Sequence, residues 1–318
     1  MKLQFIVSKQ TNPYLNIAVE NHLVAQPDGG AVTLYLWRNH RTVVIGQNQN
    51  PYSECNLEAL EADGGYLMRR RTGGGAVYHD EGNLNFSFVV PKALYDLQRQ
   101  FSVLQQAVAS FGIRTELSGR NDVLADGRKF SGNAFSKGRH HDLHHGTILI
   151  RGNMSDLQRY LRPKPAKLIK HGVRSVQSRV INLAELNPEI TPQTVTSRLL
   201  ASFQQVYNNA ATELDWKTVS AHPDVQQRFH EFASDEWRYG NWRTFTAQRS
   251  AQFAWGSIEL ALAVEGGVIH EVQIASDALD LDAIKLARTI LLGASLATKP
   301  PYNPHSIVDD ILSLVYTQ

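Results

Sequence analysis

The sequence contains a single cysteine and no long apolar run, and each of these shortages excludes a class of protein. Cys55 alone cannot form a disulfide within the chain, which fits a reducing compartment. No stretch approaches the roughly 18 apolar residues that a membrane-spanning helix needs. Residues 1–12 lack a basic segment followed by an apolar one, so we expect no signal peptide. These features predict a cytoplasmic protein without a membrane partner.

The chain also lacks an excess of either charge. Its 318 residues include 32 basic and 30 acidic side chains, which gives a formal net charge of +2. This balance disfavours a dedicated polyanion binder, and we expect no nucleic-acid partner. Hydrophobic residues make up 42% of the chain, as in an ordinary globular protein. The length suffices for one large domain and a small one.

The spacing of apolar residues predicts a mixture of helices and strands. Three helices are indicated: one begins at Pro13, one ends at Gly112 and one is capped by Thr191. Strands are predicted at residues 31–37 and 42–46, which we interpret as neighbours, and at residues 84–90 and 147–150. Because helices and strands do not alternate regularly, the sequence predicts an α+β fold.

The apolar pattern dissolves between residues 234 and 250 and then resumes in a different order. Alternating apolar segments at residues 258–264 and 268–274 flank a Glu-Gly-Gly turn and are typical of a β-hairpin. Helical spacing follows around Ile284 and around Ile311. We therefore expect two domains, residues 1–245 and residues 250–318, of which the second is a small ββαα unit.

The most informative segment covers residues 68–80. Three arginines, residues 69–71, precede three glycines, residues 73–75, which combines positive charge with backbone that can approach a ligand closely. Backbone N–H groups of such a loop can bind a phosphate or a carboxylate. The segment is not a P-loop, and Tyr78 occupies the place of the third glycine in the dinucleotide fingerprint. Taken alone, a flexible turn with solvated arginines is an equally good interpretation.

A second segment, residues 119–134, contains Asp126-Gly127, which is typical of a tight hairpin turn. Such a turn brings Asp122 on one strand close to Lys129 on the other. A lysine there can meet an anionic ligand, and Asp122 can help to hold a magnesium ion that is shared with phosphates. Taken alone, an exposed Lys–Asp pair on a surface hairpin is the better interpretation.

Two further groups of residues have an ordinary explanation. Four histidines, at positions 140, 141, 144 and 145, lie close together, but apart from Asp142 no cysteine or acidic residue has the spacing of a metal site. Cys55 lies far in sequence from the glycine-rich segment, so a structural thiol is more plausible than a nucleophile. Residues 162–174 form a basic loop without aromatic residues, which again disfavours nucleic-acid binding.

These segments, in this order and at these distances, resemble the lipoate–protein ligase family in its long form. The resemblance covers nearly the whole chain and includes Asn-Ile-Ala-Val-Glu at 16–20, residues 36–39 and 44–50, the arginine–glycine segment at 69–80, Lys-Phe-Ser-Gly-Asn-Ala at 129–134, His-His-Gly-Thr at 144–147 and residues 175–183. It implies a large mixed-sheet domain of the biotin/lipoate ligase type followed by an accessory domain. It also implies ATP-dependent activation of lipoate or octanoate, with magnesium, to an acyl-AMP.

The resemblance further implies transfer of the acyl group to a lysine of apo-carrier proteins, namely the lipoyl domains of 2-oxoacid dehydrogenase E2 subunits and the glycine cleavage H protein, in salvage of free lipoate. By the family pattern, Lys129 is the catalytic residue and contacts both lipoate and the α-phosphate. The basic loop at residues 162–174 closes over the adenine. The other implied contacts are Arg70, Gly75, Ala76, Val77 and Tyr78 for ATP or lipoyl-AMP, Gly73, Gly74 and His145 for lipoate, and Asp122 for magnesium.

Three alternatives are open at this point. An ATP-independent octanoyl or lipoyl transferase of the same fold carries its acyl group on an active-site cysteine, whereas this sequence has Lys129 at the equivalent place. A biotin ligase is a more distant enzyme. A non-catalytic protein that binds lipoyl carriers or lipoyl-AMP is expected to lack the arginine–glycine segment or the lysine, and both are present here. The sequence assigns no role to Arg71, which departs from the family pattern.

Overall fold

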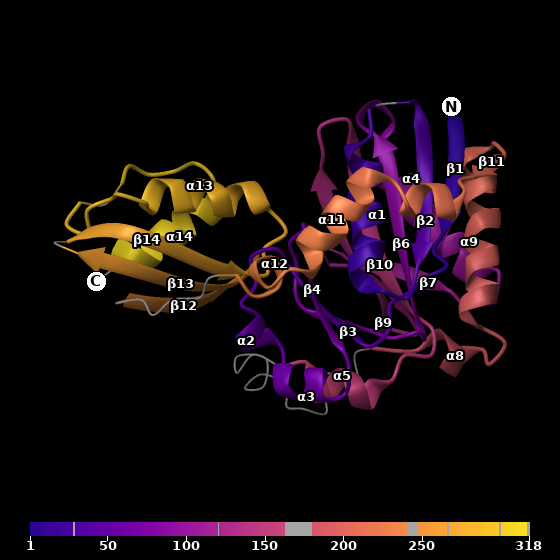
Figure 1. Ribbon diagram of the computed structural model, residues 1–318, viewed down its shortest axis with the longest axis horizontal. Helices are drawn as coiled ribbons and strands as arrows, with labels where there is room; N and C mark the ends of the chain where they lie inside the picture. Colours follow the sequence, from indigo (N-terminus) through magenta and orange to yellow (C-terminus); the bar gives the residue numbers. More distant parts are fainter. Residues whose placement is uncertain are drawn as a thin grey trace.

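The computed structural model describes residues 1–27, 29–119, 121–162, 180–240, 247–265, 267–298 and 300–316. Figure 1 shows a large part built around a long sheet and a small C-terminal part, in orange and yellow, that lies beside it. Strands and helices are mixed in both parts, which confirms the predicted α+β class. Within the described residues, no helix combines the length and the apolar character required to cross a membrane.

The large part contains an eight-stranded sheet in the order β11-β1-β2-β6-β10-β9-β8-β7. β1 runs parallel to β2 and to β11, whereas the other neighbours pair antiparallel, so the sheet is mixed. Its strands are β1 (Lys2–Val7), β2 (Ala31–Trp37), β6 (Asn83–Pro91), β7 (Thr115–Ser118), β8 (Asp122–Ala125), β9 (Arg128–Lys137), β10 (His141–Leu149) and β11 (Ala211–Glu213).

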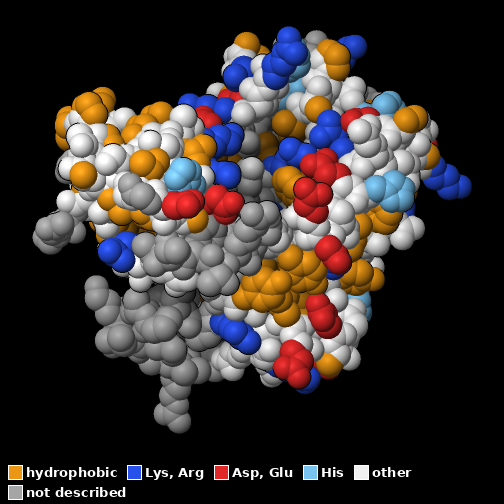
Figure 2. Space-filling view, turned by 60° about the vertical axis from the view of Figure 1, so that its left-hand side comes forward, with side chains coloured by type: hydrophobic (Ala, Val, Ile, Leu, Met, Phe, Trp, Pro, Cys, Tyr) orange, Lys and Arg blue, Asp and Glu red, His pale blue; other side chains and the backbone are white. Residues whose placement is uncertain are grey.

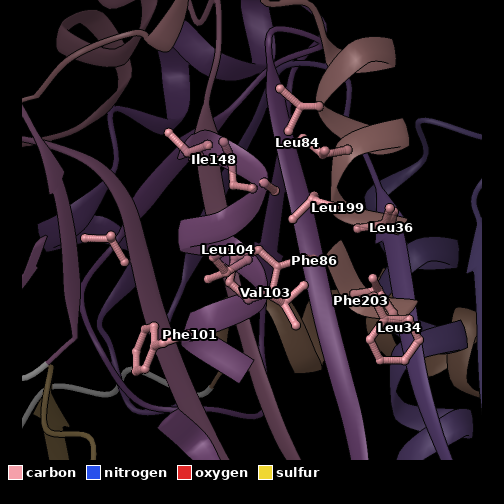
Figure 3. Close-up of a cluster of buried hydrophobic side chains, with 14 of the residues drawn as sticks. Leu34, Leu36, Leu84, Phe86, Phe101, Val103, Leu104, Ile148, Leu199 and Phe203 are labelled. Carbon is pink, nitrogen blue, oxygen red and sulfur yellow. The ribbon is translucent and has the colours of Figure 1, made fainter. Parts of the chain in front are cut away.

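Helices cover both faces of this sheet. Helices α4 (Leu97–Ala109) and α9 (Pro192–Tyr207) pack on one face, where Leu104 and Phe203 meet Phe86 of β6 in the cluster drawn in Figure 3. Helices α1 (Pro13–Ala25) and α11 (Pro223–Ala233) pack on the other face, where Ile17 and Phe232 belong to a second apolar cluster. Burial of both faces explains why β6 is continuously buried.

The three predicted helices are confirmed, although α4 ends at Ala109, before Gly112. Asn12 caps α1 by accepting from the backbone N–H groups of Tyr14 and Leu15, and Thr191 caps α9 by accepting from Thr194. Short helical segments connect the remaining elements: α2 (Pro51–Glu54), α3 (Leu57–Ala62), η1 (Lys92–Leu94), α5 (Met154–Tyr160), α8 (Leu183–Leu186), α10 (Trp216–Ser220) and α12 (Asp235–Tyr239).

A second, three-stranded sheet in the order β4-β3-β5 carries the glycine-rich loop between its outer strands. The strands are β3 (Thr42–Ile45), β4 (Tyr66–Arg69) and β5 (Val77–His79). The expectation that residues 31–37 and 42–46 form neighbouring strands is wrong, because β2 pairs with β1 and β6 whereas β3 pairs with β4 and β5. The polar connection contains Arg41 at φ +23° and leads the chain from one sheet to the other instead of closing a hairpin.

Strand β10 begins at His141 and is therefore longer than the predicted strand at residues 147–150. Its first half contains histidines, which hide the strand from a search for apolar residues. These histidines are nevertheless buried, because neighbouring residues supply hydrogen-bond partners for His144 and His145.

The C-terminal part has three strands and two helices, so the predicted ββαα order is wrong by one strand. The elements are β12 (Ala247–Phe253), β13 (Gly256–Glu265), β14 (Val268–Ser276), α13 (Leu281–Leu291) and α14 (Ser306–Tyr316). Strand β12 is mostly polar and lies at an edge, so that only its pairing with β13 makes it a strand. Ile258, Ile284 and Ile311 belong to an apolar core that is confined to this part.

Candidate active site

A cavity of about 290 Å³ lies where the glycine-rich loop, the β8–β9 hairpin and strand β10 meet. Ligand pockets usually span about 300–1,000 Å³, so this cavity suits one small molecule. Two of its charged residues, Lys129 and Asp122, are 34% and 35% exposed, whereas His79, His145, Asn85 and Asn133 are buried. The lining includes apolar Ile17, Trp37, Val44 and Met68 and the predicted residues Arg70, Gly74, Gly75, Ala76, Val77, Asp122, Lys129 and His145.

The glycine-rich loop passes very close to the end of β3. A Cβ atom on Gly46 would lie 2.4 Å from the carbonyl oxygen of Gly74, and Gly74 itself has φ +93°. Both positions therefore require glycine, the first for close approach of two backbones and the second for its left-handed conformation. The loop is a tightly packed element of the second sheet.

Arg70 holds this loop from the inside. Its guanidinium donates to the carbonyl oxygens of Gly73 at 2.7 Å and Gly75 at 2.9 Å, and to Thr72 Oγ1 at 3.1 Å. The side chain is buried, and burial lowers the pKa of Arg70 to about 10. Arg70 lines the cavity, but its donors are directed to the loop, so the interpretation of solvated arginines is wrong for this residue.

The two flanking arginines join the loop to α11 and α12. Arg69 is buried and donates to the carbonyl oxygens of Trp237 and Arg238 at 2.9 Å each. Arg71 pairs with Glu231, and its guanidinium lies 4.9 Å from the centroid of the Trp237 ring. Arg71, to which the sequence alone assigns no role, thus holds two helices against the glycine-rich loop.

The predicted hairpin is confirmed. Asp126 and Gly127 connect β8 to β9 with φ angles of +51° and +66°, as a tight two-residue turn requires. The hairpin brings Lys129 Nζ within 2.7 Å of Asp122 Oδ1. A Cβ atom on Gly132 would lie 2.9 Å from Lys129 Nζ, so the lysine side chain runs over this glycine towards the cavity.

A buried polar network beneath the loop involves Glu20, to which the sequence assigns no role. Glu20 Oε2 accepts from Ser87 Oγ at 2.5 Å and lies 2.8 Å from His145 Nδ1. His145 Nε2 lies 2.8 Å from Thr72 Oγ1, which accepts from Arg70. Every contact is satisfied when Thr72 Oγ1 donates to His145 Nε2 and His145 Nδ1 donates to Glu20. The sequence feature that could have indicated this role is a glutamate on the apolar face of the first helix.

Two predicted ligand contacts lie outside the cavity. Alternation along β5 points Tyr78 away from Val77, and the Tyr78 hydroxyl donates to Asp156 Oδ2 at 3.2 Å. Gly73 faces the C-terminal part, where a Cβ atom would lie 2.0 Å from the carbonyl oxygen of Ala278. The structure therefore places Tyr78 and Gly73 outside the lining of this cavity.

The C-terminal part contributes to the cavity wall through Asp277 and Leu279. The backbone N–H of Gly74 donates to Ala278 O at 3.3 Å, which fixes this segment against the loop.

A larger hollow of about 690 Å³ lies between Arg69 and helix α13. Figure 2 shows Lys and Arg side chains, in blue, around a hollow on this face of the molecule. None of the predicted site residues lines the larger hollow.

The two adjacent histidines of β10, His144 and His145, have different hydrogen-bond partners. His144 is buried between Gln100 Oε1 at 2.9 Å and Asn133 Oδ1 at 2.8 Å, whereas His145 faces Glu20 and the cavity. Adjacent residues of a strand point to opposite faces, so these two histidines do not converge on one ligand.

Cys55 is 1% exposed and packs in the apolar cluster of the second sheet. Burial raises the pKa of its thiol to about 12, which disfavours the thiolate that a nucleophile needs. The expected adenine-covering loop falls mostly at residues 163–174, which lie outside the described residues.

Models of two protein families match the chain. The Lipoyl protein ligase A/B catalytic domain matches residues 12–204, and the Bacterial lipoate protein ligase C-terminus matches residues 243–299. The first match covers more than half of the chain and contains the glycine-rich loop, the hairpin and strand β10. The second covers most of the C-terminal sheet and α13.

Known proteins agree with these matches. A lipoate–protein ligase A of Psychrobacter cryohalolentis is 40% identical over 92% of this chain and 88% of its own length. The P. falciparum protein LipL1, solved in complex with lipoate, has a TM-score of 0.86 and 30% identity over 99% of this chain and 100% of that one. A lipoate–protein ligase A bound with ATP shares the fold, with a TM-score of 0.63 and 23% identity over 76% of this chain and 99% of that one. The chain belongs to the lipoate–protein ligase family.

Proposed function

We propose that the chain activates lipoate with ATP as lipoyl-AMP and transfers the lipoyl group to a lysine of a carrier protein. Family membership, the lipoate bound to LipL1 and the ATP bound to a ligase of the same fold support this reaction. At the level of atoms, one observation carries the proposal: Lys129 is a partly exposed cation on a small cavity that apolar side chains, glycine-rich backbone and polar side chains line together.

The proposed chemistry explains why the site needs a cation. A carboxylate oxygen of the acid attacks the α-phosphorus of ATP, which forms the acyl adenylate and releases pyrophosphate. Lys129 contacts the carboxylate and the α-phosphate and neutralises the charge that gathers between them. The amine of the carrier lysine then attacks the acyl carbonyl carbon, loses a proton and displaces AMP. No side chain of the chain forms a covalent intermediate in this scheme.

We assign catalysis to Lys129 and divide the other predicted residues by their contacts. The apolar walls formed by Ile17, Trp37, Val44 and Met68 suit the methylene chain of the acid and exclude water from it. Arg70 acts by fixing the loop carbonyls. The residues proposed to meet the ligand are Gly74, Gly75, Ala76, Val77, Lys129 and His145, whereas Gly73 and Tyr78 support the loop from outside.

The division into residues 1–245 and 250–318 belongs to the same proposal. The C-terminal part has a separate apolar core, yet Leu279 and Asp277 line the cavity of the large part. A movement of the small domain therefore opens or closes one wall of the acid site, between adenylation and transfer.

Magnesium enters the proposal only as the ion that accompanies ATP. Asp122 is paired with Lys129, and no group of three potential metal ligands occurs among the described residues. The side chains described here do not form a metal site by themselves, and we derive no step from the ion. We propose that the carrier proteins are the E2 lipoyl domains and the glycine cleavage H protein. We also propose that octanoate is a second acid substrate. The proposed location is the cytoplasm, where ATP and free lipoate are both present.

Intact mass spectrometry of an apo-carrier tests the function. Incubation with the protein, ATP, magnesium and lipoate is expected to add one lipoyl mass, and omission of ATP is expected to abolish the addition. Addition that persists without ATP would indicate the acyltransferase alternative. Exchange of pyrophosphate into ATP that depends on lipoate would exclude a protein that only binds lipoyl-AMP. Absence of both the mass shift and the exchange would overturn the proposal.

A further inference from the structure

Two polar side chains line the buried end of the cavity, and each has one nitrogen atom without a hydrogen-bond partner among the described residues. His79 and Asn85 both line the cavity and are 3% and 1% exposed. Neither His79 Nε2 nor Asn85 Nδ2 has a hydrogen-bond partner among the described residues. A buried polar group without a partner costs free energy, so such groups on a cavity wall are expected to bind a water molecule or a ligand atom.

The proton of His79 can be located from its neighbours. Asn16 Nδ2 donates to the carbonyl oxygen of Arg38 at 2.9 Å, which fixes the orientation of that amide, and also to Asn39 Oδ1 at 3.1 Å. Asn39 therefore presents Nδ2 to His79 Nδ1, at 3.3 Å. His79 Nδ1 must accept, and the proton of the neutral ring lies on Nε2. Burial, with Arg70 nearby, lowers the pKa of His79 to about 3, so the ring is neutral at pH 7.

Asn85 lies beside the indole ring of Trp37, which is also close to His79. Asn85 Oδ1 accepts from Asn83 Nδ2 at 3.1 Å, and Asn85 Nδ2 has no partner among the described residues. Asn85 pairs with Trp37 in the register of β6 and β2, and the Trp37 ring lies 6.3 Å from the His79 ring. The Trp37 N–H is already used, because it donates to Ser87 Oγ at 3.1 Å. Two nitrogen donors thus flank Trp37 at the buried end of the site.

We propose that His79 and Asn85 recognise the far end of the acid and select a tail with sulfur acceptors over an unsubstituted alkyl tail. This inference rests on the proposed function. Thioether-type sulfur is a weak hydrogen-bond acceptor, whereas a terminal methyl group accepts nothing and leaves both N–H groups unpaired. Lipoate carries a disulfide ring at this end and octanoate does not. The structure therefore favours lipoate as the preferred acid.

Direct binding of the two acids to the full-length protein, measured by titration calorimetry without nucleotide, tests the inference. The measured quantity is the ratio of the affinity for lipoate to the affinity for octanoate. Because hydrogen bonds to sulfur are weak, we expect His79→Phe and Asn85→Leu each to lower this ratio by about three- to tenfold. His79→Gln, which retains an N–H near the position of Nε2, is expected to restore most of it.

Ile17→Val serves as the matched control, because Ile17 lines the same cavity with a purely apolar side chain. It is expected to change the affinity for both acids by a similar factor and to leave the ratio unchanged. Thermal unfolding of each variant checks that the fold is retained, and Asn85→Leu provides an independent test if a change at His79 unfolds the protein. A ratio that stays constant in His79→Phe and Asn85→Leu would overturn the inference. Failure of the unaltered protein to bind either acid would instead overturn the proposed function.

Discussion

Lys129 Nζ lies 2.7 Å from Asp122 Oδ1, across the two strands of one hairpin. About a third of each side chain is exposed, so water screens the pair and its contribution to stability is small. The close passage over Gly132 keeps the lysine extended along the strand. The ammonium group is therefore positioned at the cavity without being buried, and an incoming anion can replace the carboxylate as its partner.

Replacement of Lys129 by alanine should separate activity from stability. We expect Lys129→Ala to lower lipoate-dependent exchange of pyrophosphate into ATP by about 10²–10³-fold, because it removes the cation that offsets the developing charge. The free energy of unfolding should change by less than about 1 kcal/mol, because the ion pair is solvated. Lys137→Ala, at the exposed end of the same strand, is the control and should retain activity. Full exchange activity in Lys129→Ala would contradict the assignment.

Two neighbouring glycines should respond differently to the same substitution. A Cβ atom on Gly73 meets the Ala278 carbonyl oxygen at 2.0 Å, whereas a Cβ atom on Gly75 has no atom within 4 Å. We expect Gly73→Ala to lower stability by about 1–3 kcal/mol, or to release the C-terminal part from the loop, because overpacking forces a backbone to move. Gly75→Ala should have little effect on stability. Calorimetric unfolding and limited proteolysis measure both effects, and equal behaviour of the two variants would contradict the contact.

The buried thiol of Cys55 should be unreactive towards alkylating reagents in the folded protein. Because burial raises its pKa to about 12, the thiolate is scarce at pH 8, and we expect iodoacetamide to modify Cys55 only after denaturation. Cys55→Ala should retain ligase activity and lose about 1 kcal/mol of stability through a lost apolar contact. Mass spectrometry detects the modification. Loss of acyl transfer in Cys55→Ala at full folding would support the thioester route of the acyltransferase alternative.

Buried histidines should make the protein less stable as the pH falls. The pKa of His79 is about 3 in the folded protein and 6.5 in an unfolded chain, mainly because of burial, and burial lowers the pKa of His144 as well. Between these values the unfolded chain binds a proton that the folded protein does not. Each such histidine therefore costs up to about 1.4 kcal/mol per pH unit below pH 6.5.

Urea unfolding at pH 7, 6 and 5 measures this dependence. The free energy of unfolding should decrease at each step, and His79→Gln should show a shallower decrease because glutamine does not titrate. Equal free energies at pH 7 and pH 5 would show that both histidines can take up a proton in the folded state.

The elements that the sequence predicted correctly depend on local signals. Helices α1 and α9 have Asn12 and Thr191 as caps, and the turn at Asp126 and Gly127 aligns Lys129 with Asp122 through residues that are close in the chain. Strand β12 escaped prediction because its residues are mostly polar, and only pairing with β13 orders it as a strand. The family was also recognisable, because its motifs keep their order and spacing along the chain.

By itself, the sequence determined the starts of helices α1 and α9, the lysine hairpin and the family. The tertiary structure alone decided which side chains meet. His145 reaches Glu20 from 125 positions away, and Leu279 reaches the cavity from the other part of the molecule. It also decided that Arg69 and Arg70 bind carbonyl groups rather than solvent and that Tyr78 faces away from the cavity. Caps and turns arise from contacts between near neighbours in the chain, whereas these partnerships exist only after distant segments have packed.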